Sequence, residues 1–268
     1  MKNILISFLA ILFIFSCKAP CDVVRKVNKE HFNSAPPGTV WIKDSIYIDK
    51  CEIRNLDYLE YTNWLKVYEP INYEKALPDS LVWRDSLSSN EPYVRYYFTH
   101  PAYRNFPVVG VSYEQALAYC KWRTDRVKEF IKLRKHSNTI EKIFHAKDFY
   151  YRLPSQAEWE YAASAGLNSI YGFESMHTKN NWPNFNVKET ALLGYANHDV
   201  TVPCFYAKPN KFGLYNTIGN VAEMIQDKGV CKGGSWFHSI ESCEIKSALK
   251  YVKPTAWIGF RCVCVVVK

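Results

Sequence analysis

The stretch YYRLPSQAEWEYAASAG, residues 150–166, carries the clearest signal for a local fold in this chain. Pro154 ends the preceding element, because proline lacks the backbone N–H that a continuing element needs. Ser155 suits the N-cap of a helix, and Glu158 stands three residues later, which is the spacing of a capping box. Gly166 predicts the end of the helix, since glycine readily adopts the left-handed conformation found there.

A second stretch, PVVGVSYEQALAYCKW at residues 107–122, repeats this plan. The apolar run from Val108 to Val111 predicts a short buried strand, and Ser112 suits a helix N-cap. Apolar residues then recur at helical spacing. We therefore predict an amphipathic helix after the strand.

The remaining segments predict a mixed α and β domain with long loops. Alternating apolar and polar residues predict strands over about 39–53, and a helical period follows with Asn55 as its N-cap. Residues 70–107 lack a sustained period and predict irregular structure, as do most of 167–232. The final strand signal is GFRCVCVVV, residues 259–267.

The opening MKNILISFLAILFIFSC is typical of a secretory signal, with one lysine before an apolar run. The run is shorter than the roughly 20 apolar residues that span a bilayer. A cysteine at the cleavage point resembles the lipobox of bacterial lipoproteins, whereas ordinary cleavage beside an incidental cysteine is the alternative. We predict a signal peptide at 1–16, a lipid on Cys17, a polar tether over 17–36 and one domain at 37–268.

The net charge of +8 is spread along the chain, apart from the basic run at residues 127–136. The apolar spacing of this run predicts an amphipathic helix with a solvated basic face, and nucleic acid is not an expected partner of an exported protein. The nine cysteines include no CxxC pair, which favours disulfides over a zinc site. The partners of six cysteines stay open: Cys21, Cys51, Cys204, Cys231, Cys243 and Cys264.

Five segments together resemble, in order and spacing, the hallmark segments of the formylglycine-generating enzyme family, also called the sulfatase-modifying-factor domain. They are PPGTVWIKDSIYIDKCEIRNLDYLEYTNWL, PVVGVSYEQALAYCKW, YRLPSQAEWEYAASAG, FGLYNTIGNVAEM with KGGSW, and GFRC. The resemblance runs from about residue 36 to 266. It implies an α+β domain, a variant of the C-type-lectin fold that is poor in regular secondary structure.

A narrower likeness lies in LPDSLVWRDSLSSNEPYVRYYFTHPAYR, with WRTDRV further on. These segments are similar to gliding-motility lipoproteins that work with the type IX secretion machinery. The likeness implies a lipid-anchored protein whose partners are other membrane-associated motility and secretion proteins. Lys18, next to the lipidated cysteine, does not oppose transfer to the outer membrane, so we expect the periplasmic face of that membrane, with display on the cell surface as the alternative. Residues 82–104 are a candidate contact surface, because Trp, Tyr and Arg are enriched at interfaces. Internal packing of these aromatic rings is the alternative.

In the resembling enzymes, a Cys-x4-Cys pair after the GGS strand performs an oxidation. One thiol engages the substrate cysteine, and the pair holds a copper ion that activates oxygen. Counted from the glycines of KGGSW, these places fall on His238 and Cys243. Imidazole can ligate copper but cannot form a mixed disulfide, which requires a thiolate.

The resemblance therefore implies a degenerate site at His238 and Cys243 and a noncatalytic structural or assembly role. The alternative is a copper-dependent oxidoreductase with an altered active site. Cys243 alone is open to several interpretations: a bridge partner, a buried thiol, a reactive thiol, or a metal ligand together with His238.

The resemblance also implies a disulfide between Cys120, on the helix after VGVS, and Cys262 in GFRC. A second family bridge would need cysteines where Ala163 and Ala248 stand, so we expect that pair to be lost. The loop closed by the remaining bridge is long, and such a cross-link stabilises a fold by a few kcal/mol.

A calcium ion at the GN turn is implied as well, because calcium prefers several oxygen ligands. Its expected ligands are the Glu223 carboxylate and the carbonyls of Ile218, Gly219 and Val221. Hydrogen bonding by Asn220 and Glu223 without a metal is the alternative. No other cofactor is expected.

Overall fold

The computed structural model describes residues 35–84, 90–133, 148–173 and 200–267. The signal peptide predicted at 1–16, Cys17 and nearly all of the tether lie outside these residues. Within the described ranges, no helix combines the length and apolar character needed to cross a membrane.

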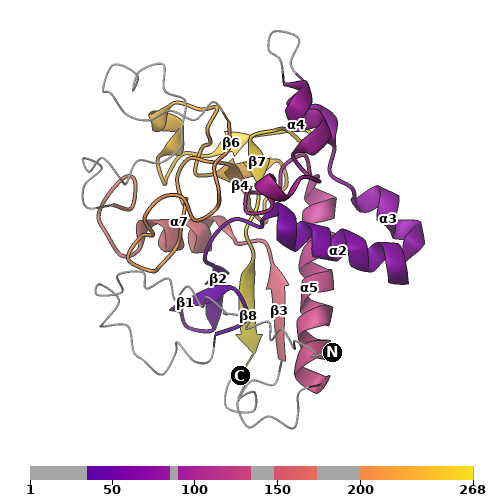
Figure 1. The fold of residues 1–268 in the computed structure, drawn as a ribbon. Coiled ribbons are helices and arrows are strands. Elements are labelled where there is room, and N and C mark those ends of the chain that lie inside the picture. Colours follow the sequence, from indigo (N-terminus) through magenta and orange to yellow (C-terminus); the bar gives the residue numbers. More distant parts are fainter. Residues whose placement is uncertain (1–34, 85–89, 134–147, 174–199, 268) are drawn as a thin grey trace, which may run out of the picture.

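Two small sheets and a set of helices build the domain (Figure 1). The first sheet has the order β1-β2-β8-β3 with antiparallel neighbours throughout. The second has the order β6-β5-β4-β7, in which β4 and β7 run parallel. The strands are β1 (Thr39–Lys43), β2 (Ile46–Asp49), β3 (Asp148–Arg152), β4 (Ala222–Met224), β5 (Val230–Lys232), β6 (Leu249–Lys250), β7 (Ile258–Gly259) and β8 (Val263–Val267).

The helices are mostly short, and several are single turns. The α-helices are α2 (Asn55–Tyr68), α3 (Pro70–Ala76), α4 (Glu91–Tyr96), α5 (Tyr113–Leu133) and α7 (Gln156–Ser164), and the 3-10 turns are η1 (Ser80–Trp83), η2 (Pro101–Tyr103) and η4 (Ile240–Cys243). The long helix α5 runs beside β3, and α2 crosses α5 (Figure 1).

Both faces of the first sheet are covered. Successive residues of a strand point to opposite sides, so each strand contributes to the packing on both faces. Tyr47 and Cys264 belong to the main core, together with residues of α2 and α5. Their neighbours Ile48 and Val263 pack on the other face, against Ala162 of α7. The main core also includes residues of β4, β5 and β7, so it joins the two sheets.

Two capping boxes start the helices where the sequence predicts them. The Ser155 hydroxyl accepts a hydrogen bond from the Glu158 amide at 3.3 Å, and the Glu158 carboxylate accepts one from the Ser155 amide at 2.8 Å. Ser112 and Gln115 make the same reciprocal pair at the start of α5. Helix α7 ends at Ser164, just before the left-handed residue Ala165.

Two expectations about local structure are wrong. The strand expected at 108–111 does not form. Its backbone bonds two different segments, because Val108 donates to Ile53 O and Gly110 donates to Thr255 O. Arg54, not Asn55, is the N-cap of α2. Asn55 is instead the first helical residue and donates its side-chain N–H groups to two loop carbonyls.

The segment predicted to be irregular, 70–107, contains short helices that begin at prolines. Pro70 and Pro101 each occupy the first position of a helix, and Pro92 the second position of α4. Proline is favoured there because its missing N–H has no partner in a first turn. The predicted final strand is also divided, since β7 ends at Gly259 and β8 begins at Val263.

Arg261 fills the gap between β7 and β8 and is fully buried. Its Nε and Nη2 atoms donate to the two carboxylate oxygens of Glu223, on β4, each at 2.6 Å. Further guanidinium N–H groups donate to the backbone carbonyls of Asp49 and Tyr215, at 3.2 and 2.8 Å. The paired carboxylate raises the pKa of Arg261, which opposes the effect of burial, so the ion pair persists in the interior. This side chain ties the second sheet to the end of β2.

We predict that Arg261→Met lowers the free energy of unfolding by about 3–5 kcal/mol, because it leaves the Glu223 carboxylate buried without its cation. Urea denaturation measures the loss. Arg84→Met is the control, since the Arg84–Glu91 pair is exposed and should contribute little. The double variant Arg261→Met/Glu223→Gln should recover part of the loss. Equal effects of the two arginine substitutions would contradict the assignment.

Candidate functional site

The glycines after β5 shape the turn around which the predicted site is built. Gly233 and Gly234 both have positive φ, +88° and +62°. A Cβ on Gly233 would lie 2.9 Å from the Trp159 ring, and one on Gly234 would collide with Cys243. The turn therefore requires glycine at both positions, and it presses directly against the cysteine.

His238 is held by this turn through its backbone and its side chain. The His238 amide donates to Ser235 O at 3.0 Å, and the imidazole Nδ1 forms a 2.7 Å hydrogen bond with the Ser235 hydroxyl. The ring meets Trp257 edge-on, with centroids 4.6 Å apart. Burial lowers the pKa of His238 below its ordinary value, so the imidazole is neutral at pH 7.

Cys243 ends η4 and is completely buried beside Ile218. Its thiol donates to the Ser239 carbonyl at 3.5 Å. Burial raises the pKa of Cys243 to about 12, although backbone N–H groups of Gly219 and Ser235 act in the opposite direction. A thiol in this state is protonated at neutral pH and is a poor nucleophile.

The structure thus brings His238 and Cys243 to the same GGS turn but gives each a protein partner. These two side chains do not fit the copper-binding thiol pair of the resembling enzymes, because one is an imidazole and the other an inaccessible thiol. In the part of the chain that the structure describes, no group of three or more His, Cys, Asp or Glu side chains could hold a metal ion.

The predicted calcium ligand Glu223 already accepts three N–H donors. Arg261 donates to both of its oxygens, and the Trp159 indole donates to one of them at 2.7 Å. A calcium ion using the carbonyls of Ile218, Gly219 and Val221 would have to share this carboxylate with Arg261. The calcium site therefore stays a prediction.

Glu52 is a buried carboxylate that the sequence analysis missed. Its oxygens accept from Asn220 at 2.8 Å and from Asn216 at 3.4 Å, and the Asn220 side chain also bonds both backbone groups of Val202. Burial raises the pKa of Glu52 to about 7, with Arg261 acting in the opposite direction. The sequence carries no local signal for this residue, because Glu52 lies beyond the end of β2 and its neighbours Cys51 and Ile53 are buried as well.

The sulfur atoms of Cys120 and Cys262 lie 3.5 Å apart in the core. This is farther than the roughly 2 Å of a disulfide bond, so the structure shows two adjacent thiols. Ala163 is buried and Ala248 is exposed at the positions of the expected lost pair. The Cys120–Cys262 bridge stays a prediction.

In the described part of the candidate contact surface, 82–84 and 90–104, most polar side chains are exposed, whereas most aromatic rings are buried or half-buried. Trp83 and Tyr97 are 2% and 0% exposed, and their rings pack with centroids 4.6 Å apart. Trp83 also stacks on Trp236, near the GGS turn. The aromatic rings of this segment thus serve mainly in internal packing, with Tyr96 as a half-exposed exception.

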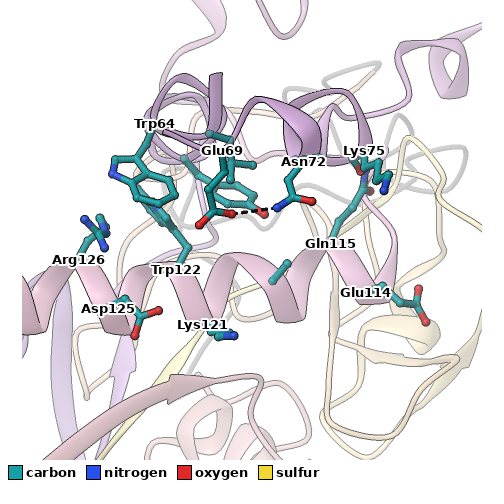
Figure 2. Close-up of a pocket in the computed structure, with 14 residues that line it drawn as sticks. Trp64, Glu69, Asn72, Lys75, Glu114, Gln115, Lys121, Trp122, Asp125 and Arg126 are labelled. Atoms are coloured by element: carbon teal, nitrogen blue, oxygen red, sulfur yellow. Dashed lines mark hydrogen bonds between the residues drawn. The ribbon is translucent and has the colours of Figure 1, made fainter. Parts of the chain in front are cut away.

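A groove of about 470 Å³ lies between α2, α3 and α5, lined by none of the GGS-turn residues (Figure 2). Two of its polar side chains donate to other groups nearby: Asn72 donates to Glu69 at 2.9 Å, and Gln115 donates to the carbonyls of Lys75 and Leu77. The Arg126 guanidinium lies 4.4 Å from the centre of the Trp64 ring. These contacts hold side chains of α2, α3 and α5 in place along the groove.

Comparison with known proteins identifies one family. Residues 20–266 match the family described as "Sulfatase-modifying factor enzyme 1-like domain". The formylglycine-generating enzyme of Mus musculus is 26% identical over 215 residues, which cover 69% of this chain and 49% of that protein. The predicted family resemblance is confirmed.

Two further relatives carry different names. "Inactive C-alpha-formylglycine-generating enzyme 2" of Bos taurus is 30% identical over 149 residues, covering 51% of this chain and 40% of that protein. "Chaperone protein LppX" of Paenibacillus barcinonensis is 27% identical over 179 residues, covering 54% and 64%. The chain thus spans about half the length of the curated relatives it matches.

The solved structure of CarF has the same fold, with a TM-score of 0.57, 16% identity, and coverage of 87% of this chain and 95% of that chain. This likeness concerns the fold alone. The predicted α+β class and the family's variant of the C-type-lectin fold are confirmed.

We predict that Cys243 resists alkylation in the native protein. A thiol with a pKa of about 12 is ionised roughly 3,000-fold less at pH 7.5 than one with the usual value near 8.5. Iodoacetamide should therefore leave Cys243 unmodified in buffer and modify it in urea, as peptide mass spectrometry would show. Rapid labelling of the folded protein would contradict the buried, protonated state.

We also predict that Glu52 makes stability depend on pH. The folded state keeps a proton up to a pKa of about 7, whereas the unfolded chain releases it near 4.3. The free energy of unfolding should therefore fall by roughly 3 kcal/mol as pH rises from about 4.5 to above 7. Glu52→Gln should remove this fall in urea denaturation at pH 5 and pH 8. Exposed Glu60→Gln is the control, and an unchanged pH dependence in Glu52→Gln would refute the assignment.

Proposed function

Because the chain belongs to the sulfatase-modifying factor enzyme 1-like domain family, we propose that it is a noncatalytic structural or assembly component held at the outer membrane by a lipid on Cys17. Its partners are membrane-associated proteins of gliding motility and type IX secretion. The proposal has three parts: loss of the oxidation chemistry, retention of the domain as a rigid frame, and attachment of that frame to the periplasmic face of a membrane.

The chemistry of residues 238 and 243 supports the loss of the oxidation reaction. Formation of a mixed disulfide with a substrate cysteine needs a thiolate, and His238 offers an imidazole instead. Cys243 is fully buried with a raised pKa, so it cannot take over this step. The position of the oxidation site is kept, but its nucleophile is absent.

Two relatives support a role without formylglycine formation. The bovine protein is named inactive and the Paenibacillus protein is named a chaperone. A frame fixed by a buried ion pair and dense aromatic packing is suited to presenting loops to partner proteins. Membership of this fold alone does not decide function, which lies in the residues placed on it.

The gliding and secretion role rests on the likeness of residues 77–104 and of WRTDRV to motility lipoproteins. A protein anchored through Cys17 would keep the domain close to the membrane and to other anchored subunits. Because the rings of 82–104 are mostly interior, the likeness in this segment reflects a shared packing unit as much as a contact surface.

A copper-dependent oxidoreductase with an altered site is the second candidate. The neutral imidazole of His238 favours it, because neutral imidazole is a copper ligand. Several relatives are also named formylglycine-generating enzymes. This alternative requires Cys243 to become accessible and lose its proton.

We predict that gene deletion impairs secretion or surface movement, whereas His238→Ala/Cys243→Ser leaves both intact. Cys17→Ser should behave like the deletion, because it removes the anchor without touching the domain. The purified protein, supplied with copper and a cysteine-containing peptide, should consume no oxygen above a peptide-free control. A normally folded double variant that behaves like the deletion would contradict the noncatalytic proposal.

A further inference from the structure

Two cysteines that are distant in the sequence meet beside the Glu52 network. Cys51 lies just after β2, and Cys204 lies in the segment that follows residue 200. Their exposed fractions are 8% and 0%. Burial and, after it, the neighbouring Cys51 thiol raise the pKa of the Cys204 thiol.

Backbone and side-chain contacts fix both segments in this position. The Cys204 amide donates to Asn105 O at 2.8 Å, and Arg54 donates to the Asn105 side chain at 3.1 Å. On the other side, one N–H-bearing atom, Asn216 Nδ2, lies 3.1 Å from Cys204 O and 3.4 Å from the Glu52 carboxylate. These hydrogen bonds therefore fix the relative position of the two cysteines, whether or not the thiols contact each other.

We propose that Cys51 and Cys204 form a disulfide that locks the segment around residue 204 onto the end of β2. One sulfur–sulfur bond forms, two S–H bonds break, and their two protons pass to the two thiols that the oxidant becomes. The two electrons pass to a small disulfide oxidant such as oxidised glutathione, which is reduced to two thiols. Exchange runs through a mixed disulfide between the oxidant and one of the two cysteines.

Only one of the two sulfur atoms can be reached from a cavity. Cys51 lines a cavity of about 300 Å³ together with Arg54 and Phe205, whereas Cys204 is completely buried. Burial also raises the pKa of Cys204 well above its usual range. Cys51 is thus the sulfur that exchanges with the oxidant, and a reductant would attack the closed bond at the same sulfur.

Peptide mapping of the full-length protein tests the pairing. The protein is refolded in oxidised glutathione, alkylated and digested without reduction. The expected product is one peptide pair that joins Cys51 to Cys204 and separates after reduction. Free, alkylated Cys51 and Cys204, or linkage of either one to another cysteine, would overturn the proposal.

Thermal unfolding supplies a second measurement that does not depend on digestion. Closing so long a loop should raise the melting temperature of the oxidised protein by about 5–15 °C over the reduced protein. Cys51→Ala/Cys204→Ala should lose this part of the reductant-dependent shift, and Cys231→Ala/Cys264→Ala should keep it. Cys120→Ala/Cys262→Ala separates any contribution from that pair. A shift of the same size in Cys51→Ala/Cys204→Ala and in the wild type would refute the bond.

Discussion

The pairing of a buried guanidinium with a buried carboxylate is the constraint on which this fold depends. Arg261 and Glu223 are each about 1% exposed, and removing two charges from water is costly unless every donor and acceptor is satisfied. Here the hydrogen-bond partners of the two charged groups come from four parts of the chain: β4, the end of β2, the Tyr215 turn and the indole of Trp159 on α7. The ion pair thereby holds segments with little regular structure in one arrangement, including the loops that bond to it.

Local signals were enough to predict the starts of α5 and α7, because a capping box is complete within four residues, as at Ser155 and Glu158. The buried charges were not predictable in this way. Arg261 finds its partners 38 and 212 residues away along the chain, at Glu223 and Asp49. The apolar run 108–111 misled for a related reason, since its burial is real but its hydrogen bonds go to separate segments and form no strand ladder.

At the candidate site, the positions of the residues could be predicted from the sequence, but their burial and protonation could not. Resemblance located His238 and Cys243 by counting from the GGS segment, and the structure places both at that turn. Counting could not show that Cys243 packs against Ile218 and keeps its proton. Nor could it find Glu52, whose titration depends on burial and on two asparagines far along the chain. Chemical state follows from tertiary surroundings, which a local pattern does not contain.

The two glycines of the GGS turn have a consequence for how members of this family are sorted by sequence. Side chains at 233 and 234 are forbidden by the Trp159 ring and by Cys243, whatever reaction the domain performs. A genome survey that takes this motif as a mark of enzymatic competence would rest on a packing requirement and not on the residues that carry chemistry. The informative columns of such a survey are those of residues 238 and 243, because the turn tolerates an imidazole at the first without any change in its own glycines.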